Sequence, residues 1–263
     1  MNKNSPIGVF DSGVGGSSIW KEVNKLLPCE HIIYLADSKN APYGNKSSEE
    51  ITTLSIKNIE KLLHMGCKII VIACNTATTN AIATVRENYS IPIIGIEPAI
   101  KPAALQTTSK NIGILATKGT LSSALFSKTT QEFTKDIRVI EIIGEGLVTL
   151  IEAGNLDGPE MISLLKKHTK PMIDANVDYV VLGCSHYPYI IPQLKKILPE
   201  NVKIIDSGEA VARQTKTVLQ SLNLLREEKT KPSLQFFTNA ETATLKFLLS
   251  AYSESISVEK MDF

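Results

Sequence analysis

Three segments of this chain occur twice, in the same order and about 110 residues apart. The segment IGVFDSGVGGSSI begins at Ile7 and resembles IGILATKGTLSSA, which begins at Ile112. In the same way, VIACNTATTNAI contains Cys74 and resembles VLGCSHYPYIIP, which contains Cys184. The third pair is IPIIGIEPA and NVKIIDSGEA. A repeat of this length is large enough to be a complete structural unit. The pattern therefore predicts a duplicated unit and a molecule built of two similar halves.

Each half alternates short β-branched runs with longer segments of helical periodicity. Residues 49–65 (EEITTLSIKNIEKLLHM), for example, carry apolar side chains at roughly every third or fourth position, as an amphipathic helix does. The expected strands are apolar almost throughout, which is typical of parallel sheets covered by helices on both faces. These strands are residues 7–11, 31–37, 68–74, 91–95, 111–117, 138–143, 177–184, 202–206 and 234–239.

The expected fold class is therefore α/β, with two similar domains related by pseudo-two-fold symmetry. Each domain is a mostly parallel sheet flanked by helices. Residues 1–96 and 207–263 form the first domain and residues 97–206 the second, because the chain after residue 206 is too short for a third core. Ligands of such sheets bind beyond the carboxyl ends of the strands. We expect the active site in the cleft between the two domains.

Composition and charge argue against several classes of protein. The chain is 43% hydrophobic and 21% charged, with a formal net charge of +1, which favours neither a nucleic-acid partner nor a membrane partner. No apolar run reaches the roughly 18 residues that span a bilayer, and the first residues lack the apolar core of a signal peptide. We therefore expect a cytoplasmic protein whose four cysteines stay reduced. No metal-ligand spacing and no cofactor motif is visible, so neither a metal nor a cofactor is expected.

Cys74 and Cys184 occupy equivalent places at the ends of predicted strands. The residues that follow them are polar: Asn75 and Thr76 in one case, Ser185 and His186 in the other. A thiol at a helix N-terminus should ionise more readily than a free one. The alternative is that both cysteines are small buried core residues. Their occurrence at matched strand ends favours a chemical role.

Asp11 and Ser12 follow the first predicted strand, in FDSGVGG. The glycines allow a tight turn close to an anionic ligand, but the lysine of a P-loop and the spacing of a dinucleotide motif are missing. Asp11 should face the same cleft as Cys74, where it would hold a substrate ammonium or take a proton from the thiol. The alternative is an Asx turn or a helix cap. In the second half Ala116 and Thr117 stand at the matching positions.

Three further places in the sequence carry candidate site residues. Tyr43 and Gly44, in the loop APYGNKS, are expected to shape the floor of the pocket. His186 is a candidate acid–base partner for Cys184. Glu152 has no cysteine or histidine near it in the sequence, and the residues around it predict only a solvated carboxylate.

Two equivalent thiols at one cleft point to inversion of a carbon centre. A thiolate on one face removes a proton, and a thiol on the other face returns one. Helix N-termini and the exclusion of water stabilise the charge that develops, so no cofactor is required. With reacting contacts of about 3–3.5 Å on each side, the two sulfurs should lie about 7 Å apart.

The motifs FDSGVGG, PYG, ACNTAT and GCSHYP, in this order, resemble those of the glutamate racemases in the cofactor-independent aspartate/glutamate racemase superfamily. The resemblance covers essentially the whole chain. It implies a cytoplasmic isomerase, usually a homodimer, which interconverts L- and D-glutamate and supplies D-glutamate for peptidoglycan synthesis. The residues that it implies for catalysis are Cys74 and Cys184 as the two acid/bases, with Asp11, His186 and Glu152 in support. The substrate-binding positions that it implies are Asp11, Ser12, Tyr43, Gly44, Asn75, Thr76, Thr117, Thr120, Ser185 and His186.

Two other activities stay open at this point. An aspartate or related amino-acid racemase is one, although the histidine of GCSHYP fits glutamate racemases better than aspartate racemases, which carry an acidic residue there. The family also usually has threonine where this chain has Ser185, so packing and affinity should change slightly. A cysteine hydrolase using Cys184 and His186 is the other, and it has no use for Cys74. Some glutamate racemases restrain DNA gyrase, and nothing in this sequence decides whether this protein does.

Overall fold

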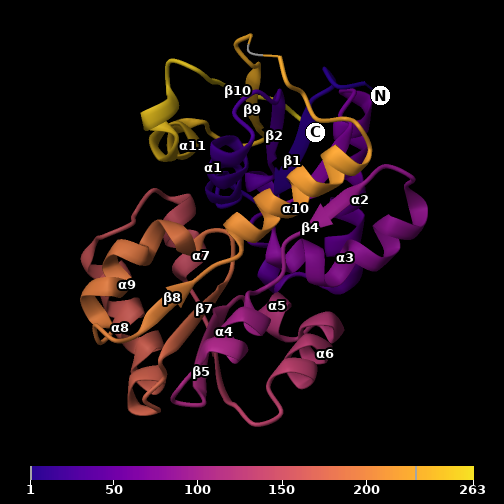
Figure 1. The fold of residues 1–263 in the computed structure, drawn as a ribbon. Coiled ribbons are helices and arrows are strands. Elements are labelled where there is room, and N and C mark those ends of the chain that lie inside the picture. The colour runs from indigo at the N-terminus through magenta and orange to yellow at the C-terminus, as the bar shows by residue number, and fades with distance from the viewer. Residues whose placement is uncertain (1, 229) are drawn as a thin grey trace.

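The computed structural model describes residues 2–228 and 230–263, and within them it contains two parallel sheets (Figure 1). The first sheet has the strand order β10-β9-β2-β1-β3-β4, and the second has the order β6-β5-β7-β8. The strands of the first sheet are β1 (Ile7–Asp11), β2 (Ile32–Ala36), β3 (Ile69–Ile72), β4 (Ile93–Gly95), β9 (Leu234–Thr238) and β10 (Ser257–Lys260). Those of the second are β5 (Asn111–Ala116), β6 (Arg138–Ile143), β7 (Tyr179–Gly183) and β8 (Lys203–Ile205).

The four strands β2-β1-β3-β4 are repeated as β6-β5-β7-β8, and the register is repeated with them. Ile7 of β1 lies opposite Ile69 of β3, and Ile112 of β5 lies opposite Tyr179 of β7. These are the positions that the sequence repeat makes equivalent. The predicted duplication and the α/β fold are thus confirmed, in agreement with a pseudo-two-fold relation between the halves.

Each of the nine predicted strands is present, with ends shifted by at most two residues. The prediction missed β10, which lies at the edge of the first sheet beside β9. Its sequence, SVEK, is polar and at least partly exposed, so it lacks the apolar run that revealed the other strands. Both β9 and β10 come from the C-terminal part of the chain and extend the first sheet beyond β2.

Helices cover both faces of each sheet, because alternate residues of the buried strands point to opposite sides. In β1, Val9 packs in the same cluster as α1 and α10, whereas Phe10 packs in the cluster of α2 and α3. In β5, Leu115 faces α8 and α9, whereas Ile114 faces α4 and α6. The α-helices are α1 (Ser17–Leu26), α2 (Ser48–His64), α3 (Asn75–Asn88), α4 (Ile100–Gln106), α5 (Lys118–Leu121), α6 (Ala124–Phe133), α7 (Leu147–Glu152), α8 (Pro159–Asp174), α9 (Ile191–Ile197), α10 (Gly208–Ser221) and α11 (Ala243–Leu248). The 3₁₀ helices are η1 (Ser38–Asn40), η2 (Tyr43–Asn45), η3 (Tyr187–Ile190) and η4 (Ser250–Tyr252).

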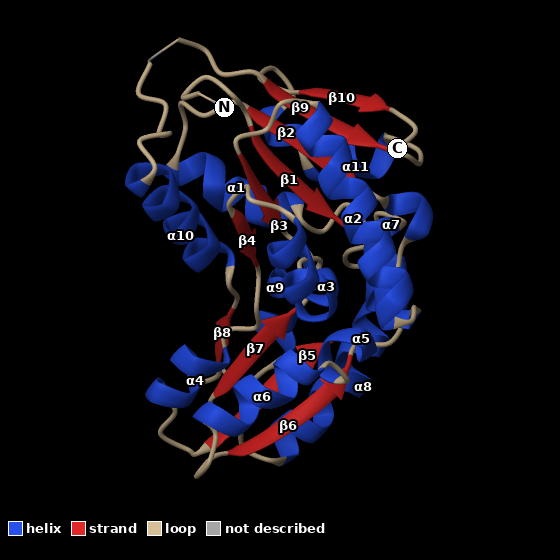
Figure 2. Ribbon diagram, turned by 90° about the vertical axis from the view of Figure 1, so that its right-hand side faces the viewer, coloured by secondary structure: helices blue, strands red, loops and turns tan. Residues whose placement is uncertain are grey.

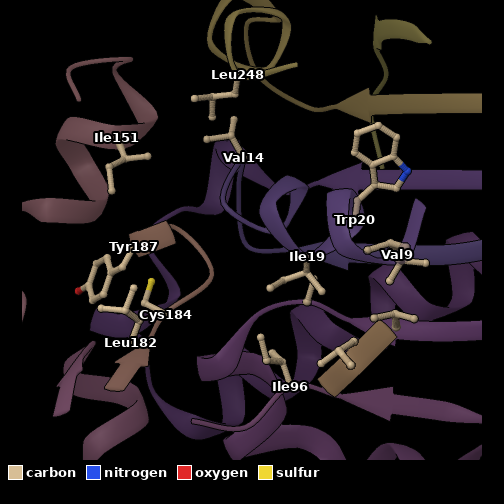
Figure 3. Close-up of a cluster of buried hydrophobic side chains, with 14 of the residues drawn as sticks. Val9, Val14, Ile19, Trp20, Ile96, Ile151, Leu182, Cys184, Tyr187 and Leu248 are labelled. Carbon is tan, nitrogen blue, oxygen red and sulfur yellow. The ribbon is translucent and has the colours of Figure 1, made fainter. Parts of the chain in front are cut away.

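The central strands of both sheets point their carboxyl ends toward the region where the halves meet (Figure 2). One buried apolar cluster continues through this region and includes Ile19 and Ile96 from one half and Leu182 and Tyr187 from the other. Cys184 lies beside Leu182 and Tyr187 in this cluster (Figure 3). The loops that follow the strands are therefore brought together at a packed junction. Within the described residues, none of the helices combines the length and the apolar character needed to cross a bilayer.

Candidate active site

Both cysteines singled out by the sequence line one small cavity between the two sheets. We call it the inner cavity. The centre of a water molecule can occupy about 10 Å³ of it, which is roughly enough for one bound water. The residues around it are Ser12, Pro42, Tyr43, Gly44, Cys74, Asn75, Thr76, Thr117, Val148, Cys184, Ser185 and His186. Pro42 and Val148 were not among the predicted site residues, because neither carries a group that signals chemistry. Of the predicted site residues, Asp11, Thr120 and Glu152 lie just behind this wall.

Cys74 is the N-cap of α3, since β3 ends at Ile72 and the helix begins at Asn75. Its Sγ accepts from the backbone N–H of Ala77 at 3.4 Å and lies 3.4 Å from Oγ of Ser12, to which it donates. Burial raises the pKa of the Cys74 thiol, and the nearby charge of Asp11 raises it further. The hydrogen bonds with Ser12 and with the helix N-terminus lower the pKa of Cys74, but by less than burial and Asp11 raise it. Burial thus outweighs the helix N-terminus, and the expectation of a readily ionised thiol is wrong for Cys74.

Asn75 and Thr76 place polar groups beside Cys74 at the start of α3. The side chain of Asn75 is buried, and neither its amide nitrogen nor its amide oxygen has a hydrogen-bond partner within the described part of the chain. Oγ1 of Thr76 lies 2.7 Å from Oγ1 of Thr117 and 3.2 Å from Oγ1 of Thr120. Three hydroxyls contributed by both halves thus gather at one point. The unpartnered amide and this hydroxyl group suit a ligand with several hydrogen-bonding atoms.

Cys184 lies next to a histidine and a carboxylate. Its Sγ is 3.7 Å from Nδ1 of His186, and Nε2 of His186 is 2.6 Å from Oε1 of Glu152. Burial alone lowers the pKa of His186, but the hydrogen bonds to Cys184 and Glu152 outweigh it, and the pKa lies well above its usual value. His186 therefore connects Cys184 to Glu152 in one chain of polar contacts.

Glu152 is not the solvated carboxylate that its neighbours in sequence predicted. Its side chain is 17% exposed, and besides His186 it accepts from the backbone N–H of Val14 at 2.7 Å and from Oγ of Ser38 at 3.0 Å. Val14 and Ser38 belong to the first half of the chain and are more than 100 residues away. No local signal could have revealed these contacts, whereas the family resemblance did place a glutamate on the Cys184 side.

Asp11 is fully buried at the junction of the halves. Its Oδ2 accepts from the backbone N–H groups of Gly13 at 3.2 Å and Gly16 at 3.0 Å, and its Oδ1 accepts from Oγ of Ser185 at 3.0 Å. The first contact is the Asx turn that the sequence offered as an alternative. Burial raises the pKa of Asp11, and the charge of His186 partly offsets this. Asp11 thus shapes the glycine loop and ties it to Ser185.

Two glycines of FDSGVGG let this loop approach the second half. A Cβ atom at Gly13 would lie 1.9 Å from Oε1 of Glu152, and a Cβ atom at Gly15 would lie 2.3 Å from Nδ1 of His186. Neither distance is compatible with a side chain. The glycines are therefore needed for close contact with His186 and Glu152, rather than for cradling a phosphate.

Gly44 makes a similar approach on the other side of the cavity. A Cβ atom there would lie 2.8 Å from Cβ of Thr117. The same residue also lines a second, wider cavity of about 210 Å³, together with Pro42, Thr117 and Val148. Since these four residues border both spaces, the wider cavity adjoins the inner one.

The walls of the inner cavity contain neither lysine nor arginine. Across residues 2–228 and 230–263, no three His, Cys, Asp or Glu side chains are grouped as metal ligands. The groups that the cavity offers to a ligand are therefore two thiols, an imidazole, hydroxyls, an amide and backbone N–H groups. Two thiols on one cavity, each at the end of an equivalent strand, can exchange protons with a single ligand.

Residues 7–215 match the protein family described as Asp/Glu/Hydantoin racemase. The chain belongs to this family. It is 47% identical over 227 residues to the glutamate racemase of Ectopseudomonas mendocina (strain ymp), with 86% of each chain covered. Its fold is similar to that of glutamate racemase isoform RacE1 from Bacillus anthracis, with a TM-score of 0.87, 33% identity and coverage of 100% of this chain and 99% of that one.

A second solved structure is that of Escherichia coli glutamate racemase in complex with L-glutamate and the activator UDP-MurNAc-ala. It has a TM-score of 0.86 and 32% identity to this chain, and 98% of each chain is covered. The resemblance inferred from the four motifs is therefore confirmed, and the racemase family places this chain among the isomerases.

Proposed function

We propose that this protein is a glutamate racemase, which interconverts L- and D-glutamate through proton transfer at the α-carbon by two cysteines. The observation that carries this proposal is that Cys74 and Cys184 come from equivalent positions of a duplicated fold and line the same cavity. The choice of glutamate follows the relatives that resemble the chain over most of its length.

Neutral groups hold the substrate carboxylates in this proposal. The hydroxyls of Thr76 and Thr117 and the N-terminus of α3 suit a carboxylate, since hydroxyl and backbone N–H groups donate to it. The unpartnered amide of Asn75 gains partners when the substrate binds. The buried carboxylate of Asp11, which adjoins Ser12, supplies negative charge for the substrate ammonium.

Proton transfer begins from two thiols in different states. In one direction Cys184, next to His186, acts as the base, and Cys74, whose pKa is raised by burial, acts as the acid. Cys184 takes the α-proton, so that a C–H bond breaks and an S–H bond forms, and the electron pair spreads into the carboxylate. Cys74 then gives its proton to the opposite face, and a new C–H bond forms there. The reverse reaction starts from the opposite protonation states.

Substrate entry requires the halves to separate. The inner cavity has room for about one water, which is far too little for an amino acid. We propose that residues 1–96 with 207–263 and residues 97–206 are the two domains that move, so that the cleft opens toward the wider cavity. As further parts of the proposal, we carry over from the resemblance a cytoplasmic homodimer that supplies D-glutamate for peptidoglycan.

A cysteine hydrolase is the alternative that one observation favours. Sγ of Cys184 lies 3.7 Å from Nδ1 of His186, and Nε2 of that ring lies 2.6 Å from Oε1 of Glu152. A thiol, an imidazole and a carboxylate in this order can activate a nucleophilic cysteine. A hydrolase mechanism of this kind gives Cys74 no role. An aspartate racemase would use the same two thiols, so only substrate trials separate it from a glutamate racemase.

The deciding experiment follows racemisation of each glutamate enantiomer in deuterated water, with aspartate tested in parallel. Cys74→Ala and Cys184→Ala should each abolish turnover of both enantiomers, because inversion needs an acid on one face and a base on the other. Cys29→Ala, which removes a half-buried thiol outside the site, is the matched control and should keep full activity. Turnover by Cys74→Ala at the wild-type rate would refute the two-base mechanism, and turnover of aspartate but not glutamate would refute the substrate.

A further inference from the structure

Asp37 is a buried carboxylate that follows β2 and was not among the predicted site residues. Only 2% of its surface is exposed. Its oxygens accept from the hydroxyl of Tyr43, from the amide of Asn239 at 2.5 Å and from the amide of Asn40 at 2.8 Å. The amide nitrogen of Asn58 is also near, at 3.5 Å. Asp37 therefore connects the end of β2, the loop after it, α2 and the end of β9.

The orientation of the surrounding amides is set by backbone groups. Oδ1 of Asn239 accepts from the backbone N–H of Lys39 at 2.9 Å, so its NH₂ group faces Asp37. Nδ2 of Asn58 donates to the carbonyl of Leu54 at 2.9 Å, which fixes that amide in the same way. Donors therefore surround Asp37: the amides of Asn239 and Asn40 at Oδ1, and Tyr43 and Asn58 at Oδ2. An amide at this position would turn its NH₂ group toward one of these donors, unless that donor were replaced by an acceptor.

The hydroxyl of Tyr43 is fully engaged in this network. It donates its proton to Asp37 and accepts from Nδ2 of Asn58 at 3.2 Å. Tyr43 lines the inner cavity, yet its hydroxyl has no proton left to donate to a bound carboxylate. What Tyr43 and Gly44 offer a ligand is thus the aromatic ring and the backbone of η2.

We propose that Asp37, held by Asn239, is a positioning residue that fixes Tyr43 and the η2 turn against the cavity. The C-terminal segment thereby takes part in the site without touching the substrate, since Asn239 follows β9. This inference rests on the proposed function, because the turn is taken to contact glutamate. The same geometry also gives a prediction about the turn itself that needs no substrate.

An exchange of the two side chains tests the proposal. Asp37→Asn turns an amide NH₂ toward donors, and Asn239→Asp brings two carboxylates together. We expect each single variant to raise KM for glutamate about tenfold or more, with a smaller change in kcat. In the double variant Asp37→Asn/Asn239→Asp, the NH₂ group at position 37 faces the new carboxylate at position 239, and the remaining oxygen at position 37 still accepts from Tyr43. The contact between the two positions is thus restored with donor and acceptor reversed. Its KM should return to within about threefold of the wild-type value.

Hydrogen exchange of peptides covering residues 38–47 provides the readout that is independent of activity. Exchange there should be faster in both single variants and near the wild-type rate in the double variant. Asp178→Asn is the matched control, since Asp178 accepts from Thr107 and from the backbone N–H of Thr108, each at 2.6 Å, outside the site. It should lower the melting temperature and leave KM unchanged.

Two results would overturn the inference. One is a KM for Asp37→Asn within twofold of the wild-type value. The other is a double variant that stays as impaired as the single variants in both KM and hydrogen exchange. A wild-type protein that does not racemise glutamate would instead refute the proposed function, and the exchange data alone would then decide whether Asp37 fixes the turn.

Discussion

Replacing Gly15 by alanine should disable the histidine next to Cys184 while leaving the chain folded. The new Cβ atom would lie 2.3 Å from Nδ1 and 2.4 Å from Cγ of His186. An ordinary contact needs about 3.4 Å, so the ring or the loop must move by about 1 Å. Gly15 does not have a positive φ, so alanine can adopt its backbone conformation. The effect should therefore come from the displaced imidazole.

A displacement of about 1 Å at a reacting group costs roughly 100-fold in rate, or about 2.7 kcal/mol of activation free energy. We expect kcat/KM of Gly15→Ala to fall by about this factor in both directions, as measured by the change in circular dichroism of each enantiomer. Gly13→Ala should act similarly through Glu152, since its Cβ atom would meet Oε1 at 1.9 Å.

Gly208→Ala is the matched control, because its added Cβ atom comes no closer than 3.1 Å to Asp206 and Glu22. It should keep activity within about twofold of the wild-type value. A Gly15→Ala enzyme with kcat/KM within threefold of wild type, and with an unchanged melting temperature, would refute the role assigned to the close approach of Gly15 and His186.

Two further predictions concern binding and stability. Asn75→Ala should raise KM for glutamate about tenfold or more, since charge-assisted hydrogen bonds contribute about 1.5–3 kcal/mol. It should not lower the melting temperature, because among the described residues the amide has no partner whose hydrogen bond would be lost. Asp178→Asn should lower the free energy of unfolding by about 1–2 kcal/mol. Burial alone would raise the pKa of Asp178, but hydrogen bonds from Thr107, Thr108 and Ser109 outweigh it and hold that pKa below its usual range. The stabilisation is thus complete above the unfolded pKa of about 3.9 and is lost as pH falls toward the lower folded pKa, so acid denaturation curves of the two proteins should converge below about pH 4.

The sheets could be predicted because their strands are buried on both faces. Runs such as 69–72 are apolar at every position, and the repeat fixed which strands are equivalent before any contact was known. β10 lacked this signal because it is a polar edge strand. Lys68 could not be predicted as a core residue, because it is charged. It is nevertheless fully buried, with Nζ 2.6 Å from Oε2 of Glu30. A pairing between distant charges leaves no local pattern in the sequence.

The site could be predicted where a residue is chemically distinctive and follows a strand. Cys74 and Cys184 met both conditions, and the loops after parallel strands converge by topology. The surroundings of these residues could not be predicted in the same way. Two of the three hydrogen bonds of Glu152, those from Val14 and Ser38, come from the other half, and the raised pKa of Cys74 arises from burial. Asp37 is held by side chains from the loop after β2, from α2 and from the end of β9.

The two sulfurs have unequal neighbours: an imidazole and a carboxylate beside Cys184, but a hydroxyl and one backbone N–H beside Cys74. For an enzyme that interconverts mirror images, this inequality has a thermodynamic limit. The enantiomers have equal free energies in water, so the Haldane relation requires the same kcat/KM in both directions. If the unequal surroundings make kcat larger in one direction, KM in that direction must therefore be larger by the same factor. The surroundings of the two sulfurs can thus change the fraction of enzyme occupied by each enantiomer, but they cannot change the equilibrium ratio of the two.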